Sequence, residues 1–197
     1  HFPLRRRRQM CIRDSSDAMG GTLSVNKKVF KKIMFFYKLS GYRMAADEAY
    51  LIIRGLRTLD VRLKQHFENT KQIIKFLKKQ KKIKEILYPH NPSSKNYKLW
   101  KKYYSGATGL LSIVIKSKKK ASVIKFVNSL ELFGIGYSWG GFESLAILQD
   151  LRKRSEYIKG RTYFRFNNDE YIVRLHIGLE HPQDLINDLK NSLKFIK

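Results

Sequence analysis

The sequence has almost no cysteine and few acidic residues. Cys11 is the single cysteine among 197 residues, which excludes an internal disulfide and a cysteine-based zinc site. We therefore expect a reducing, cytoplasmic setting. No uninterrupted apolar run reaches the roughly 18 residues of a membrane span, and no apolar segment follows the basic start as it would in a secretory signal. The sequence thus predicts neither a membrane protein nor a disulfide-rich secreted domain.

The scarcity of acidic residues, 16 against 41 lysines and arginines, gives a formal net charge of +25. A charge of this size is found in proteins that bind nucleic acid or anionic lipid. The lysines are spread along the chain, however, and the runs at 78–82 and 116–120 lie at the ends of amphipathic or apolar segments, as solvated helix ends do. We predict no nucleic-acid partner. A basic nucleic-acid-binding module is the alternative from another class, and DNA binding with a steep salt dependence would reveal it.

The beginning of the chain divides into three parts by composition. Residues 1–15 are arginine-rich in a chain whose other basic residues are mostly lysine, and we interpret them as a non-native leader. A basic nucleic-acid arm or a processed targeting segment are the alternatives. Residues 16–42 hold a glycine turn, a short strand and a helix over 27–38 that Gly41 interrupts. Residues 43–80 predict a long amphipathic linking helix with a break near Gly55, and its apolar residues recur at helical spacing: Ala45, Ala49, Ile52, Ile53, Leu56, Leu59, Leu63, Phe67, Ile74 and Leu77.

Residues 81–197 alternate between strand-like and helix-like segments. Strands are predicted at 83–88, 109–115, 135–139, 144–148 and 171–178, and helices at 99–104, 121–133 and 182–196. This alternation predicts an α/β domain with a small, mostly antiparallel sheet that helices cover mainly on one face. With 43% apolar residues, the chain can form a packed core.

Two segments carry residues that core packing does not explain. Arg174 interrupts a strand whose other members are apolar, and a buried arginine needs a partner. Its planar guanidinium suits a carboxylate, so it is a candidate for binding a substrate carboxylate. An internal salt bridge or a solvent-facing edge position is the simpler alternative. In the second segment, Tyr137, Ser138 and Trp139 precede two glycines, which permit a tight turn or a close approach to a ligand. The simpler alternative there is a strand-turn-strand with a core tryptophan.

Both segments resemble signatures of the cystathionine γ-synthase/β-lyase family. A tryptophan after the serine, and a histidine after Arg174-Leu175, resemble the bacterial β-lyases more than the synthases. The resemblance runs from about Ser16 to the C-terminus and is carried by four ordered motifs: Ser16-Asp17-Ala18-Met19-Gly20-Gly21, the helix from Asp47 to Leu63, Tyr137-Ser138-Trp139-Gly140-Gly141 with Glu143-Ser144-Leu145, and Arg174 to Glu180.

The resemblance implies the C-terminal portion of a fold-type-I enzyme that depends on pyridoxal 5′-phosphate. Lyases of this family cleave cystathionine to homocysteine, pyruvate and ammonia on the route to methionine, and γ-synthases and γ-lyases of the same fold are the nearest alternatives. By resemblance, Arg174 binds the substrate's α-carboxylate, Ser138 hydrogen-bonds close to it, and Tyr137 and Trp139 shape the pocket around the sulfur-bearing chain. The full-length enzyme is expected to be a homo-oligomer, a tetramer in the family.

The resemblance fails where the cofactor lysine is expected. The family carries this lysine just ahead of the segment that begins at Ser16, but no lysine precedes Lys27 in this chain, and the count back falls near Met10. We therefore assign no catalytic residue, and we expect this polypeptide to bind pyridoxal phosphate weakly or not at all and to be inactive as it stands. No metal site is predicted, because the histidines have no carboxylate or cysteine neighbours at ligand spacing.

Overall fold

The computed structural model describes residues 5–8, 21–149, 167 and 169–197, and the chain divides into two compact units, 1–60 and 61–197. Most of the predicted leader lies outside the described residues. So does the segment from Ser16 to Gly20. Among the described helices, none is long and apolar enough to cross a bilayer.

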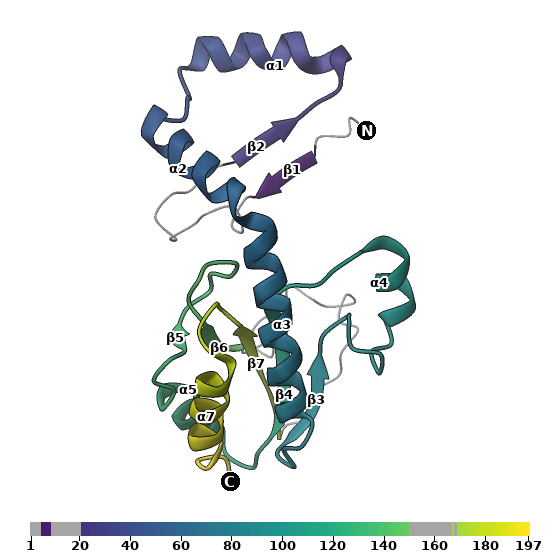
Figure 1. Ribbon diagram of the computed structural model, residues 1–197, viewed down its shortest axis with the longest axis vertical. Coiled ribbons are helices and arrows are strands. Elements are labelled where there is room, and N and C mark those ends of the chain that lie inside the picture. The colour runs from purple at the N-terminus through teal and green to yellow at the C-terminus, as the bar shows by residue number, and fades with distance from the viewer. Residues whose placement is uncertain (1–4, 9–20, 150–166, 168) are drawn as a thin grey trace. The chain divides into compact units, whose positions relative to one another are not determined.

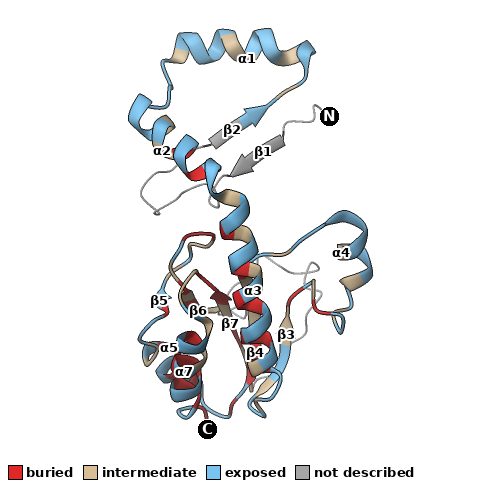
Figure 2. Ribbon diagram, viewed as in Figure 1, coloured by how far each residue is buried: buried red, intermediate tan, exposed pale blue. Residues whose placement is uncertain are grey.

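The first unit contains two short strands and two helices. Strands β1 (Arg5–Arg8) and β2 (Gly21–Ser24) pair antiparallel. Helix α1 (Lys27–Ser40) begins after Asn26, whose Oδ1 accepts the Val29 N–H at 3.2 Å. It ends at Gly41 with φ 68°, a conformation that glycine adopts at little cost, as the sequence predicts. No residue of α1 is buried (Figure 2).

The predicted linking helix over 43–80 is divided into α2 (Ala46–Arg57) and α3 (Leu59–Leu77). The break predicted near Gly55 falls at Thr58, where ψ is 5°, and Gly55 itself lies inside α2. The Thr58 hydroxyl donates to the Gly55 carbonyl at 3.4 Å. Such side-chain bonds to the backbone compete with the regular helical pattern, which explains a break at threonine rather than at glycine.

The second unit is built on a five-stranded sheet in the order β3-β4-β7-β6-β5, antiparallel except between β5 and β6. Strand β7 (Glu170–His176) is central, between β4 (Leu110–Lys116) and β6 (Leu145–Gln149). Strands β3 (Ile83–Leu87) and β5 (Gly134–Ile135) form the edges. Arg174 therefore lies in the middle of the sheet, opposite Ser112 on one side and Ile147 on the other.

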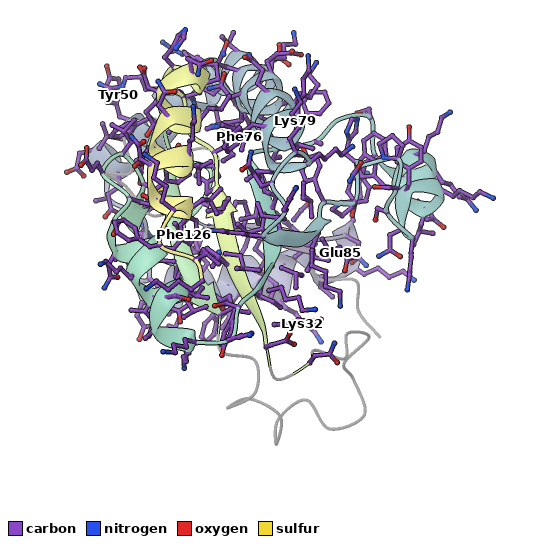
Figure 3. All side chains as sticks on the ribbon, turned by 90° about the horizontal axis from the view of Figure 1, so that it is seen from below. Lys32, Tyr50, Phe76, Lys79, Glu85 and Phe126 are labelled. Carbon is purple, nitrogen blue, oxygen red and sulfur yellow. The ribbon has the colours of Figure 1, made fainter. Side chains whose placement is uncertain are left out.

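Helices cover one face of this sheet. In Figures 1 and 3, α3 and α7 (Pro182–Leu193) run side by side on the same side of β4 and β7, and α5 (Lys120–Asn128) lies beside α7. Figure 2 shows buried residues concentrated on the strands and on these helices. The predicted α/β class, with a mostly antiparallel sheet and helices mainly on one face, is confirmed. The hydrophobic core of this unit includes Ile73, Leu77, Leu111, Ile113, Ile115, Val123, Phe126 (labelled in Figure 3), Val173, Leu175, Leu185 and Leu189.

The remaining element, α4 (Tyr97–Tyr103), matches the short helix predicted at 99–104. Its Trp100 packs against His90, with ring centroids 4.4 Å apart. The helix thus anchors the connection between β3 and β4 through aromatic contacts.

The buried side of α3 differs from the predicted one in its first half. The sequence predicts Leu63 and Phe67 inward, but both are only half-buried. The buried residues of this half are polar instead: His66, Asn69 and Thr70 are fully buried, and Arg62 is nearly so. From Ile73 onward the buried residues are apolar, as predicted. The polar half of the helix therefore needs specific hydrogen-bond partners, since buried polar groups are costly when unpaired.

Candidate functional site

The structure brings the two unusual segments of the sequence together. The Arg174 Nη2 donates to the carbonyl oxygens of Gly136 at 3.3 Å and Ser138 at 3.4 Å. The guanidinium carbon also lies 5.7 Å from the centroid of the Tyr137 ring, within the range of a cation–π contact. Arg174, Tyr137 and Ser138 therefore form one group, although 36 to 38 residues separate Arg174 from the two carbonyls it binds.

The predicted strand over 135–139 is wrong beyond Ile135. Strand β5 comprises only Gly134 and Ile135, and the chain then leaves the sheet. The carbonyls of Gly136 and Ser138 receive hydrogen bonds from Arg174 instead of from a neighbouring strand. Residues 136–139 therefore form a loop, and Arg174 satisfies two of its backbone carbonyls.

Arg174 is a half-buried cation whose described hydrogen-bond partners are neutral. Within the described residues, no carboxylate forms an ion pair with Arg174, and both of its hydrogen bonds use Nη2. Desolvation by burial lowers the pKa of the guanidinium, but arginine stays protonated in proteins. A half-buried cation that faces neutral acceptors has spare donors for an anionic group, and a carboxylate can accept two parallel bonds from it.

The turn after Trp139 is tied to the end of β7. The Gly140 N–H donates to His176 Nε2 at 3.0 Å, and the Leu179 N–H donates to the Phe142 carbonyl at 2.8 Å. Gly140 has φ 87°, where a side chain would be strained. The first of the twin glycines therefore serves the tight turn that the sequence suggests.

Ser144 makes the tightest connection between these two segments. It is fully buried, its hydroxyl accepts the Gly178 N–H at 2.8 Å and donates to Glu180 Oε2 at 2.8 Å, and its own N–H donates to Glu180 Oε1 at 2.7 Å. A Cβ on Gly178 would lie 2.2 Å from the Phe142 carbonyl oxygen. The close approach of the two backbones therefore requires glycine at this position.

The polar half of α3 supports the same region from the other side. His66 Nδ1 lies 2.8 Å from the Ile177 carbonyl oxygen, and Asn69 Nδ2 donates to the carbonyls of Gly178 and Glu180, each at 3.0 Å. Sequence reasoning missed these supporting residues. The sequence does hold a signal for them: Arg62 and His66 recur at helical spacing, each one position before the apolar residues Leu63 and Phe67.

Two aromatic side chains of residues 136–142 are exposed, and one of them, Tyr137, lies against Arg174. Tyr137 is 61% exposed and Phe142 is 49% exposed, while Ser138 and Trp139 are half-buried. The structure thus gathers all four residues predicted to bind substrate in one loop and the adjacent strand. Within the described residues there is no cluster of three or more histidine, cysteine, aspartate or glutamate side chains that could hold a metal.

Comparison with known proteins identifies the class. The fold is that of the C-terminal part of fold-type-I pyridoxal-phosphate enzymes. One similar structure is the crystal structure of cystathionine γ-synthase from Xanthomonas oryzae pv. oryzae in complex with aminoacrylate and cysteine, with a TM-score of 0.79 and 26% sequence identity. The match covers 94% of this chain and 48% of that one. Residues 12–194 match the family model described as Cys/Met metabolism PLP-dependent enzyme, and the chain belongs to this family.

The curated relatives carry different activities. A putative cystathionine β-lyase from Rhizobium johnstonii (strain DSM 114642 / LMG 32736 / 3841) is 36% identical over 181 residues, which cover 90% of this chain and 44% of the relative. An L-alanine/L-glutamate racemase from Wolbachia pipientis wMel is 36% identical over 179 residues, covering 90% and 43%. The chain thus spans less than half the length of these relatives, and the family alone does not fix the reaction.

The family's cofactor is pyridoxal 5′-phosphate. The cofactor requires a lysine amine, yet residues 1–26 contain no lysine. The segment that resembles the one following that lysine lies outside the described residues. The described residues offer a half-buried arginine, Arg174, and the loop whose carbonyls it bonds.

Proposed function

We propose that this chain is the part of a carbon–sulfur lyase that binds the substrate's carboxylate, in an enzyme that cleaves cystathionine to homocysteine, pyruvate and ammonia. The observation that carries this proposal is the position of Arg174, in the middle of an apolar strand, bonded to two loop carbonyls and paired with no carboxylate among the described residues. A charge in such a position is expected to bind an anionic ligand, because an unpaired, partly buried charge is costly.

The proposed roles follow from the geometry around Arg174. Its guanidinium binds the α-carboxylate of the amino-acid substrate through two parallel hydrogen bonds, which fix the orientation of the α-carbon. Ser138, whose carbonyl lies 3.4 Å from Nη2, hydrogen-bonds close to the same carboxylate. Tyr137 and Trp139 line the pocket for the sulfur-bearing chain. We further propose that the complete enzyme is a homo-oligomer.

The alternatives share the same carboxylate site and differ in the bond that breaks. A γ-synthase or γ-lyase is favoured by the similarity to the Xanthomonas synthase, and a racemase by the similarity to the Wolbachia protein. A carboxylate-binding arginine serves each of these reactions, because all of them act on amino acids. Product analysis is therefore the measurement that separates them.

The test uses the complete reading frame that contains this chain, purified with pyridoxal phosphate and given cystathionine or, in a separate reaction, L-alanine. Pyruvate as the product supports β-cleavage, 2-oxobutyrate supports γ-cleavage, and interconversion of alanine enantiomers without either keto acid supports a racemase. Absence of pyruvate in the presence of bound cofactor refutes the proposed reaction.

The role of Arg174 is tested in the same preparation by the Arg174→Lys variant. Lysine keeps the charge but not the planar fork, so the loss of one charge-assisted hydrogen bond, about 2 kcal/mol, should lower kcat/KM about 30-fold. Lys116→Ala, which removes an exposed cation on the neighbouring strand β4, is the matched control and should leave kcat/KM unchanged. An unaltered kcat/KM in Arg174→Lys would mean that the carboxylate binds elsewhere.

A further inference from the structure

Two histidines are buried side by side behind the loop that carries Ser138 and Trp139. His66, on α3, and His176, the last residue of β7, are 1% and 2% exposed, and their ring centroids lie 5.2 Å apart. Each ring bonds the backbone through one nitrogen. The other nitrogen, Nε2 of His66 and Nδ1 of His176, is buried without a hydrogen-bond partner in the described structure.

The backbone partner of His66 defines its tautomer, and the Gly140 N–H favours one tautomer of His176. A carbonyl oxygen only accepts, so His66 Nδ1, 2.8 Å from the Ile177 oxygen, carries the hydrogen and leaves Nε2 as an acceptor. A backbone N–H only donates, so His176 Nε2, 3.0 Å from the Gly140 nitrogen, is unprotonated and Nδ1 carries the hydrogen. The two unpartnered atoms are therefore one acceptor and one donor on adjacent rings.

A second backbone group competes for His176 Nε2, so the tautomer of His176 decides which group it bonds. Its Nε2 also lies 3.2 Å from the Gly141 carbonyl oxygen. If Nε2 carried the hydrogen, it would donate to Gly141 and leave the Gly140 N–H without this acceptor. Because a buried unpaired N–H is costly, the Gly140 N–H keeps this acceptor only while His176 carries its hydrogen on Nδ1.

We propose that His66 and His176 are positioning residues: a neutral pair in which the free Nε2 of His66 favours the Nδ1–H form of His176, so that His176 Nε2 holds Gly140 and thereby sets Ser138 and Trp139 against Arg174. The effect on substrate rests on the proposed function, whereas the pairing does not. Electrostatics are consistent with neutral rings, since desolvation by burial lowers the pKa of both. Arg62 also lowers the pKa of His66, and Arg174 that of His176. Glu180 raises the pKa of His66 and Glu143 that of His176, but each effect is smaller than that of burial.

The first test reads the tautomers directly in the full 197-residue chain. Long-range proton–nitrogen NMR correlations of ¹⁵N-histidine-labelled protein at neutral pH distinguish Nδ1–H, Nε2–H and cationic rings. We expect Nδ1–H for both His66 and His176, and the exposed His181 serves as the reference for a solvated ring. An Nε2–H or cationic His176 would overturn the proposal.

The second test measures hydrogen exchange of the Gly140 amide in matched variants. His176→Gln places an acceptor near the position of Nε2 and should retain the protection of this amide. His176→Leu keeps the bulk without an acceptor and should lose it by about tenfold or more, the factor that corresponds to one hydrogen bond. Equal protection in the two variants would contradict the proposal, and the Leu175 amide in the core should be protected equally in both.

The role of His66 is tested by His66→Asn, which can keep the donor to the Ile177 carbonyl and removes the acceptor at Nε2. We expect a mixture of tautomers at His176 and faster exchange at Gly140, and an unchanged His176 tautomer would overturn the coupling. If His176→Leu does not fold, His66→Asn and the wild-type tautomers still test the proposal. None of these measurements uses substrate or cofactor. A result that overturns the histidine pairing therefore leaves carboxylate binding by Arg174 untouched, and a failure of carboxylate binding leaves the pairing untouched.

Discussion

Replacing Ser144 by alanine removes one hydroxyl that serves two buried groups. The hydroxyl accepts the Gly178 N–H and donates to Glu180 Oε2, each at 2.8 Å, and Ser144 is fully buried. The variant loses a hydrogen bond to a charged group and leaves the buried Gly178 N–H unpaired. Each loss costs roughly 1–3 kcal/mol, and because the two share one site we expect a combined loss of about 3 kcal/mol in the free energy of unfolding.

The assay is urea unfolding followed by tryptophan fluorescence. Both tryptophans, Trp100 and Trp139, lie in the unit 61–197, so the signal reports this unit. A loss of about 3 kcal/mol should also lower Tm by about 6–12 °C in a domain of this size. The control is Ser129→Ala, whose hydroxyl bonds only the Lys125 carbonyl within a helical turn and should cost less than about 0.5 kcal/mol. A Ser144→Ala loss below about 1 kcal/mol would show that the Ser144 connection does not hold the two segments together.

Two further predictions concern the same region. Gly178→Ala should cost more than about 3 kcal/mol or prevent folding, because its Cβ would meet the Phe142 carbonyl oxygen at 2.2 Å, whereas Gly106→Ala, with no atom within 4 Å, should be tolerated when both are compared by thermal unfolding. Acidification should destabilise the unit through His176, whose pKa burial lowers from 6.5 to about 4. Between these two pKa values, His176 is protonated in the unfolded chain and neutral in the folded one. The free energy of unfolding should therefore fall by about 2 kcal/mol between about pH 7 and about pH 5. Urea titrations at both pH values should show a smaller fall in His176→Gln, and an equal fall would exclude His176 as the cause.

The interior of the fold could be predicted from local patterns. Leu185, Leu189 and Leu193 recur at helical spacing and are buried in α7, and Val123, Phe126 and Val127 do the same in α5. The order of strands and helices from Ile83 onward also follows from periodicity. These features depend on neighbours within one or two turns of the chain, and the sequence displays such neighbours directly.

An arginine in an otherwise apolar strand, and a serine and a tryptophan ahead of two glycines, can be recognised without coordinates, because residue choice alone marks them as unusual. The packing of the chain brings Arg174 to the Ser138 carbonyl, makes residues 136–139 a loop rather than a strand, and buries Arg62 and His66 on α3 in place of Leu63 and Phe67. The physical reason is the same in each case. A hydrogen bond between groups that are 36 to 111 residues apart depends on the packing of sheet and helices, and no local periodicity encodes it.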